Sequence, residues 1–180
     1  MALTKWAQFT ITCIKDDPDP NPNPNPNPDP GPGPSGWTKQ GDIYVSTINT
    51  TEGVPMKFVI INEQNKYCSP YGDGFNESCI NRSTSGAITV PGEVNGYRVY
   101  NTGSYAFQDC SKLTSINLSS SIVSTTTASF RGCHGLTSID FLSNIKQIWD
   151  KTFEDCKGLT NIVIPNSVER IYNEAFKGCI

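Results

Sequence analysis

The sequence predicts a β-rich solenoid of 23-residue units, with parallel strands and short helical turns, preceded by a small β-rich N-terminal cap. The first observation is a set of cysteines spaced 23 residues apart, at Cys110, Cys133, Cys156 and Cys179. Phenylalanines keep the same step at Phe107, Phe130, Phe153 and Phe176. A fixed period with apolar residues in register is typical of a solenoid, whose units bury their inner faces against their neighbours. We therefore expect these cysteines and phenylalanines to form the structural core of the repeat.

Residues 1–16 form the first segment and look like a degenerate signal sequence. The stretch before Cys13 is too short and too polar for a good secretory apolar core. After Cys13 come Ile14, Lys15, Asp16 and Asp17 and then a proline-rich run. This order resembles the processed end of Bacteroidetes surface lipoproteins, which implies a lipid anchor on Cys13. The alternative is an unmodified cysteine, because Thr12 stands where the lipoprotein pattern has Gly, Ala or Ser.

The second segment, residues 17–36, is a proline-rich extended linker. Nine of the 13 prolines lie between Pro18 and Pro34, where they alternate with Asp, Asn and Gly. Proline removes backbone donors and favours the polyproline II conformation, so we expect no packed structure there. Fully extended, this run would span roughly 50 to 60 Å at about 3.1 Å per residue. We interpret it as a semi-rigid stalk.

The third segment, residues 37–96, does not follow the 23-residue period. Apolar clusters at 43–45 and 58–61 are typical of β-strands. Since a solenoid needs a terminal unit that covers its first coil, we predict a β-rich N-terminal cap here. Cys68 and Cys79 lie in this cap near turn residues. Their setting is compatible with a loop-closing disulfide in an oxidising compartment and also with two free thiols.

The fourth segment, residues 97–180, holds the solenoid in three and a half repeats. Alternation of apolar and polar residues predicts short parallel strands over 113–119, 136–142 and 159–165. A second extended piece, such as 145–148 or 168–171, would return along the other side of each coil. The Ala-Phe-x-x-Cys piece would close the coil as a turn or short helix. Because the chain stops one residue after Cys179, we expect either a fragment of a longer array or a frayed last coil.

The repeat resembles the BspA-type leucine-rich repeat, a family also described from Treponema surface proteins. The resemblance rests on residues 106–116, 162–171 and 175–179, and it covers Tyr97 to Ile180. It implies a leucine-rich repeat fold and a bacterial cell-surface or secreted protein that adheres to host proteins or other cells. Thr125 to Thr127 and Trp149-Asp150 replace the usual Ile-Gly step of the family. We expect these replacements to loosen the back of the coils locally.

The repeated cysteines are candidates for metal ligands, disulfides or buried thiols. Zinc ligands converge on one point, whereas residues one coil apart form a line at about the 4.8 Å strand spacing. That spacing is compatible with disulfides, but each inner cysteine has two equal neighbours, so we favour buried thiols. His134 directly follows Cys133, so the two side chains should face opposite ways rather than form a nucleophile-base pair. We predict no catalytic, cofactor or metal site and no enzyme.

Composition limits the partners. The chain has 14 basic and 17 acidic residues, a formal charge of −3, and no basic run that would neutralise the phosphates of a nucleic acid. No stretch approaches 18 consecutive apolar residues, so we expect no transmembrane helix. The expected partner is an extracellular host or bacterial surface protein, or a glycan.

The leading hypothesis is therefore a cell-surface or secreted recognition module that binds proteins through outward positions on the repeat strands. Alternation of the strands places six candidates on this face: Ser115, Asn117, Ser138, Asp140, Asn161 and Val163. The alternatives are a glycan-capture surface lipoprotein that uses the same face and a structural spacer with no ligand of its own.

Overall fold

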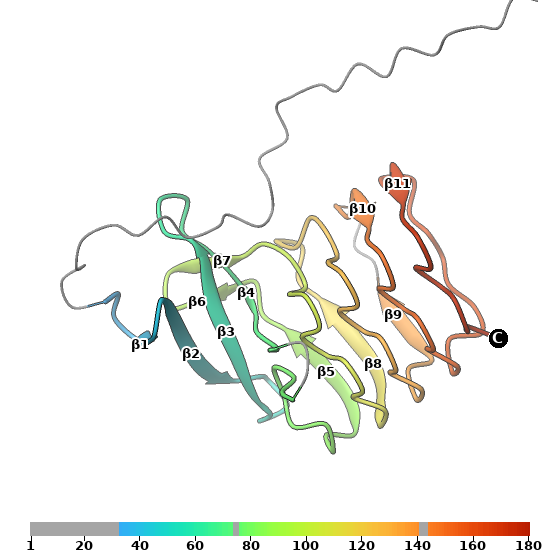
Figure 1. Ribbon diagram of the computed structural model, residues 1–180, viewed down its shortest axis with the longest axis horizontal. Helices are drawn as coiled ribbons and strands as arrows, with labels where there is room; N and C mark the ends of the chain where they lie inside the picture. Colours follow the sequence, from blue (N-terminus) through green and yellow to red (C-terminus); the bar gives the residue numbers. More distant parts are fainter. Residues whose placement is uncertain (1–32, 74–75, 141–143) are drawn as a thin grey trace, which may run out of the picture.

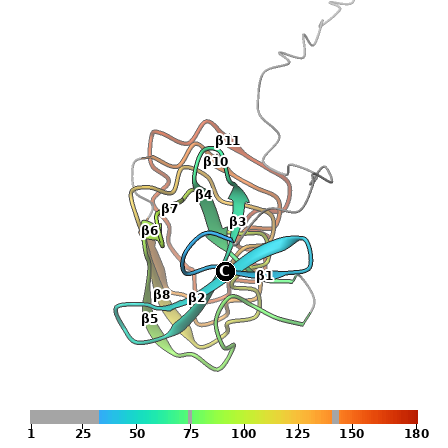
Figure 2. The same cartoon turned by 90° about the vertical axis from the view of Figure 1, so that its left-hand side faces the viewer.

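The structure, a computed structural model, describes residues 33–73, 76–140 and 144–180. Segment 1–16 with Cys13, and residues 17–32 of the linker, lie outside the described residues. The chain is strand-rich and forms two parts in a row (Figure 1). An irregular sheet at the N-terminal end is followed by coils that repeat toward the C-terminus (Figure 1), and these coils lie one behind another when viewed along their row (Figure 2).

The first part is a six-stranded sheet with the order β1-β2-β3-β4-β7-β6, which we call the N-terminal sheet. Its strands are β1 (Thr38–Gln40), β2 (Ile43–Asn49), β3 (Pro55–Asn62), β4 (Tyr67–Pro70), β6 (Glu93–Val94) and β7 (Tyr97–Val99). Strands β1 to β4 form antiparallel hairpins, whereas β4 and β7 pair in parallel. Met56 and Phe58 of β3 are fully buried, and the ring of Trp37 meets Tyr97 edge-on at 5.1 Å. Residues far apart in the sequence therefore share this core.

The second part carries a three-stranded parallel sheet with the order β5-β8-β9. Its strands are β5 (Gly86–Val90), β8 (Leu113–Leu118) and β9 (Ser138–Asp140). Ile88, Ile116 and Ile139 are partners in register and lie buried beneath the sheet. The two sheets interlock across the predicted boundary at residue 97, because β5 joins the repeat sheet whereas β7 joins the N-terminal sheet.

The opposite side of the coils carries a two-stranded parallel sheet of β10 (Gln147–Ile148) and β11 (Arg170–Ile171). Isolated parallel bridges extend it backward, from Gln147 to Ser124 and from Ser124 to Asn101. Figure 1 shows β10 and β11 across the coils from β8 and β9. The coils therefore carry parallel strand pairing on two opposite sides.

The phenylalanine column is stacked, as the sequence predicts. The rings of Phe107, Phe130, Phe153 and Phe176 follow one another with centroids 5.3 Å apart and planes within 19°. Backbone hydrogen bonds join the same coils, from Phe107 N–H to the Ser129 carbonyl at 2.8 Å and from Phe130 N–H to the Thr152 carbonyl at 2.9 Å. Equivalent residues thus lie over one another in successive coils.

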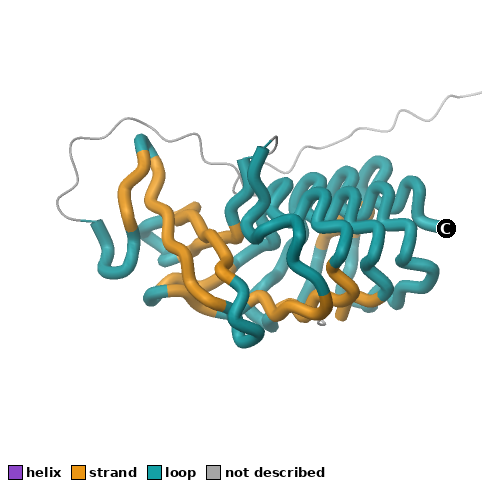
Figure 3. Tube along the Cα trace, turned by 90° about the horizontal axis from the view of Figure 1, so that it is seen from below, coloured by secondary structure: helices purple, strands orange, loops and turns teal. Residues whose placement is uncertain are grey.

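The Ala-Phe-x-x-Cys pieces are turns, and no helix occurs among the described residues (Figure 3). Of the two predicted alternatives the turn is confirmed, and the short helical turns of the predicted fold class are absent from the described residues. The reason is backbone conformation, since a residue with positive φ directly precedes each piece and a second lies just before its cysteine, and a right-handed helix excludes positive φ. In the first coil these are Tyr105 (φ 57°) and Asp109 (φ 59°), and in the second Ala128 (φ 52°) and Gly132 (φ 71°).

The repeat strands are shorter than predicted. The first covers 113–118, the second begins at 138 rather than 136 and is described as far as 140, and residues 159–165 form no strand. In the third case the described backbone makes no hydrogen bond from 160–164 to β9, so alternation alone does not produce a strand. On the other side of the coils, the predicted extended pieces 145–148 and 168–171 pair as strands only at 147–148 and 170–171.

The departures from the Ile-Gly step do not loosen the coils, contrary to our expectation. Thr125 is fully buried, its hydroxyl lies 3.2 Å from that of Thr152, and it accepts a hydrogen bond from Trp149 N–H at 3.0 Å. The Trp149 indole N–H donates to Ser124 Oγ at 3.0 Å. These hydrogen bonds compensate for the burial of polar groups, which is costly without partners.

Candidate interaction surface

The exposed side of β5, β8 and β9 forms a polar face, which we call the strand face. In β8 and β9, Ser115 pairs in register with Ser138 and Asn117 pairs with Asp140. Ser115 is half-buried and the other three are exposed, because their neighbours Ile116 and Ile139 point inward. The structure thus brings four of the predicted residues together on adjacent strands.

The other two candidates lie one coil further along, on a segment without strand pairing. Asn161 is exposed, and Val163 has 82% of its surface exposed. Alternation therefore predicts the direction of these side chains correctly. The rigid backbone ladder that holds Asn117 beside Asp140 is absent at 161–163 among the described residues.

Sequence reasoning missed a carboxylate at the start of the strand face. Glu52, in the loop between β2 and β3, accepts hydrogen bonds from Thr89 Oγ1 at 2.7 Å and from Thr89 N–H at 3.1 Å. Partial burial raises the pKa of Glu52, but hydrogen bonds from Thr89, Thr50 and Thr51 lower it to about 2. The carboxylate thereby satisfies a backbone donor of β5, the first strand of its sheet. No local pattern reveals a contact across 37 residues.

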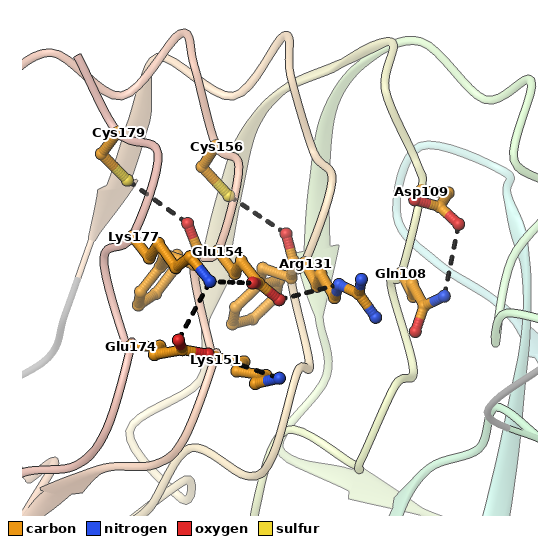
Figure 4. Close-up of polar contacts among 11 residues, drawn as sticks. Gln108, Asp109, Arg131, Lys151, Glu154, Cys156, Glu174, Lys177 and Cys179 are labelled. Carbon is orange, nitrogen blue, oxygen red and sulfur yellow. Dashed lines mark hydrogen bonds and ion pairs between the residues drawn. The ribbon is translucent and has the colours of Figure 1, made fainter.

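A charged cluster lies on the turn side of the coils (Figure 4). The buried side chain of Glu154 pairs with Arg131 Nε at 2.9 Å and with Lys177 Nζ at 3.6 Å, from the coils on either side. Lys177 also contacts Glu174, whose carboxylate pairs with Lys151 at 3.4 Å. Charges of opposite sign thus alternate between coils and neutralise one another, so this side offers a partner little net charge.

The cysteine column is a set of hydrogen-bond donors, buried at Cys133 and Cys156 and half-buried at Cys179. The thiols of Cys133 and Cys156 donate to the carbonyls of Phe107 and Phe130, each at 3.1 Å. Cys179 continues the column with a hydrogen bond to the Phe153 carbonyl at 3.3 Å, and Figure 4 shows the contacts of Cys156 and Cys179. Burial raises the pKa of Cys156 to about 12 and that of Cys133 well above its usual range. A thiol that stays protonated is a poor nucleophile and a poor metal ligand.

The disulfide considered between Cys68 and Cys79, in the predicted N-terminal cap, is not formed. Cys68 and Cys79 are buried free thiols, and all the other cysteines among the described residues are free as well. Cys68 Sγ–H donates to the Tyr97 carbonyl at 3.5 Å, and burial raises its pKa to about 12. Both cysteines belong to the apolar core, so packing and not a covalent bond holds them in place.

Other potentially reactive groups lie apart. His134 is exposed, whereas the neighbouring Cys133 is buried with its thiol bound to a carbonyl, so the two do not form a pair. Within the described ranges, no group of three or more His, Cys, Asp or Glu side chains is arranged to hold a metal ion. A pocket of about 410 Å³ beside β3 contains the ion pair of Lys57 and Glu77. No helix of the described chain is long and apolar enough to cross a membrane.

The comparisons with known proteins agree with this geometry. The family model of the BspA type leucine rich repeat region matches residues 87–180, more than half of the chain, in six copies. The matched region starts at β5, the strand that begins the parallel repeat sheet. The comparison with curated proteins finds no match.

Solved structures of bacterial leucine-rich repeat proteins are similar in fold. A leucine-rich repeat protein from Bacteroides ovatus is 27% identical with a TM-score of 0.53, over 66% of this chain and 30% of that one. The Treponema pallidum leucine-rich repeat protein is 21% identical (TM-score 0.51; 66% and 62% covered), and a leucine-rich cell surface protein from Faecalibacterium prausnitzii is 22% identical (TM-score 0.51; 81% and 31% covered). This chain thus spans about a third of the first and third of these proteins.

Proposed function

We propose, from the premise that this chain belongs to the BspA-type leucine-rich repeat family, that it is a recognition module that binds protein partners through the strand face. The observation that carries this proposal is the pair of adjacent strands with Asn117 and Asp140 exposed in register. The stacked coils beneath hold these side chains at fixed spacing, so little conformational entropy is lost when a partner binds.

The architecture that supports this role is a repeat of 23-residue units behind an N-terminal cap. Cross-coil contacts separated by 23 residues support the unit length, as in the hydrogen bond from Thr137 Oγ1 to the Thr114 carbonyl at 3.1 Å. The contact between Glu52 and Thr89 supports the cap, because it covers a backbone donor of β5. We assign residues 37–96 to the cap and 97–180 to the repeats, with β5 and β7 exchanged between their sheets.

The expected setting is the bacterial cell surface or its surroundings. The similar Faecalibacterium prausnitzii protein is described as a cell surface protein. A lipid anchor on Cys13 and a stalk over residues 17–36 would hold the strand face away from a membrane. The partner would then be a protein of a host or of another bacterium, and adhesion would be the result of binding.

Glycan capture is the second candidate, and the composition of the strand face favours it. Apart from Val163, the candidates carry hydroxyl, amide or carboxylate groups, which hydrogen-bond sugar hydroxyls. An array of host extracellular proteins beside a glycan array separates the two functions. Saturable binding to polysaccharides without affinity for proteins would replace the leading proposal by this one.

The test of the face is the triple variant Asn117→Lys, Asp140→Lys and Asn161→Lys. It should abolish binding to proteins found on the array while the thermal midpoint stays unchanged, because all three side chains are exposed. The matched control places three lysines on the N-terminal sheet, at the exposed positions Thr38, Gln40 and Asn49. If the control loses binding and the triple variant keeps it, the strand face is not the binding surface.

A further inference from the structure

One column of the coils changes from small to aromatic residues along the solenoid. At steps of 23 residues it contains Gly103, Thr126, Trp149 and Tyr172. The rings of Trp149 and Tyr172 stack with centroids 4.5 Å apart and an interplanar angle of 5°. Both side chains remain partly exposed. Ile148 is fully buried, so alternation puts its neighbours Gln147 and Trp149 on the outer surface of the β10–β11 side.

This aromatic pair is held in place before any partner arrives. The Trp149 backbone N–H donates to Thr125 Oγ1, and its indole N–H donates to Ser124 Oγ, both at 3.0 Å. The Tyr172 backbone N–H donates to the Ile148 carbonyl at 2.8 Å. With three anchoring hydrogen bonds and mutual stacking, the two rings lose little freedom on binding, which favours affinity.

An unpaired cation lies on the same side. Arg170, in β11, is exposed and pairs in register with the neutral Gln147. The described structure gives Arg170 no ion-pair partner, whereas Lys146, Lys151 and Lys177 each pair with a glutamate. The guanidinium is therefore free to bind a carboxylate through two parallel hydrogen bonds.

We propose that Arg170, Trp149 and Tyr172, which we call the Trp149 surface, bind a polypeptide partner that presents a carboxylate beside an apolar side chain. Trp, Tyr and Arg are the residue types that dominate binding energy in protein interfaces, whereas Ser and Thr are under-represented there. The carboxylate would pair with Arg170 and the apolar side chain would pack on the exposed parts of the aromatic pair. This surface lies across the coils from β8 and β9 (Figure 1), so it is independent of the strand face.

The test is to pan a phage-displayed library of 12-residue peptides on the whole protein and to measure selected synthetic peptides by fluorescence anisotropy. Peptides that combine Asp or Glu with Leu, Ile or Phe should be selected. Arg170→Glu should weaken their binding at least tenfold. Lys157→Glu is the matched control, since Lys157 is exposed without an ion-pair partner in the described structure, and it should change binding less than twofold.

Tyr172→Ser completes the test, because it removes part of the aromatic pair and leaves Arg170 in place. It should weaken the same peptides at least fivefold. A purely structural role for the pair predicts a lower thermal midpoint for Tyr172→Ser and unchanged peptide binding by Arg170→Glu, and that result would overturn the proposal. The proposal also fails if no such peptide is selected, or if ultracentrifugation shows a dimer that Arg170→Glu dissolves. The strand-face lysine variant should leave peptide binding unchanged.

Discussion

The N-terminal sheet and the repeat coils contribute to one hydrophobic core through different kinds of contact. In the sheet each contact is particular, such as Trp37 against Tyr97, which lie 60 residues apart in the sequence. In the coils one contact recurs, as when Phe130 stacks on Phe107 and Phe153 with the same spacing on both sides. Repetition makes the second kind visible in the sequence, whereas the first kind depends on a topology that the sequence does not display.

Among the variants that test this difference, Phe130→Ala should cause the largest loss of stability. Phe130 is fully buried between two rings, so its loss should destabilise the protein by about 3 to 5 kcal/mol. The matched variant is Phe58→Ala in the N-terminal sheet, also fully buried, with a similar expected loss. Urea denaturation measures both values.

The two phenylalanine variants should differ in where they act. Hydrogen exchange followed by mass spectrometry should show faster exchange in the coils on both sides of Phe130 for the first variant. For Phe58→Ala the increase should concentrate in the N-terminal sheet, because contacts in a solenoid are mostly between neighbours. An identical exchange pattern for both variants would mean that the sheet and the coils unfold as one unit, and the difference between the two regions would then have no effect on local stability.

A smaller effect is expected from Gly132→Ala, which tests how closely two coils approach. A Cβ at this position would lie 2.3 Å from Asp109 Oδ1, and the residue has φ +71°. The control is Gly41→Ala, with φ +60° and nothing within 4 Å of the added carbon. We expect a loss of about 1 kcal/mol for the control, from backbone conformation alone, and about 1 to 2 kcal/mol for Gly132→Ala, because the exposed Asp109 carboxylate must also move aside. Equal urea midpoints would contradict a close contact between the coils.

The smallest effect concerns the link between the two regions, the Glu52 carboxylate on Thr89. Partial burial raises the folded-state pKa of Glu52, but hydrogen bonds from the threonines outweigh it and lower the pKa from 4.5 to about 2. The contribution of Glu52 to stability is therefore present above pH 4.5 and disappears as the pH falls toward 2. Because the Glu52 side chain is largely solvated, we expect it to contribute only about 1 kcal/mol to the free energy of unfolding. Glu52→Gln should remove this part of the acid dependence in urea titrations between pH 2 and 6. Glu93→Gln, another exposed glutamate, is the control and should leave the profile as it is.

Much of the repeat region follows from residue spacing. The cysteine and phenylalanine columns, the inward isoleucines and the outward direction of Asn117, Asp140 and Val163 all agree with a period of two along strands and 23 between coils. Hydrophobic burial enforces this pattern, because a slip of one residue would expose every inward side chain. The length of the strands is harder to predict. Strand pairing requires backbone hydrogen bonds to a neighbouring coil, and the alternation of apolar and polar residues does not show whether these form.

The sequence by itself determined the stacking order of the coils and the side chains that fill them, because each unit buries its apolar face only against the unit before and after it. Tertiary structure alone decided the conformation of the turns, where two positive φ values per coil exclude a helix. It also decided the Glu52 contact, the neutralised charges around Glu154 and the exposed setting of Arg170 beside Trp149. These features depend on distances between coils and sheets, which side-chain order along the chain does not encode.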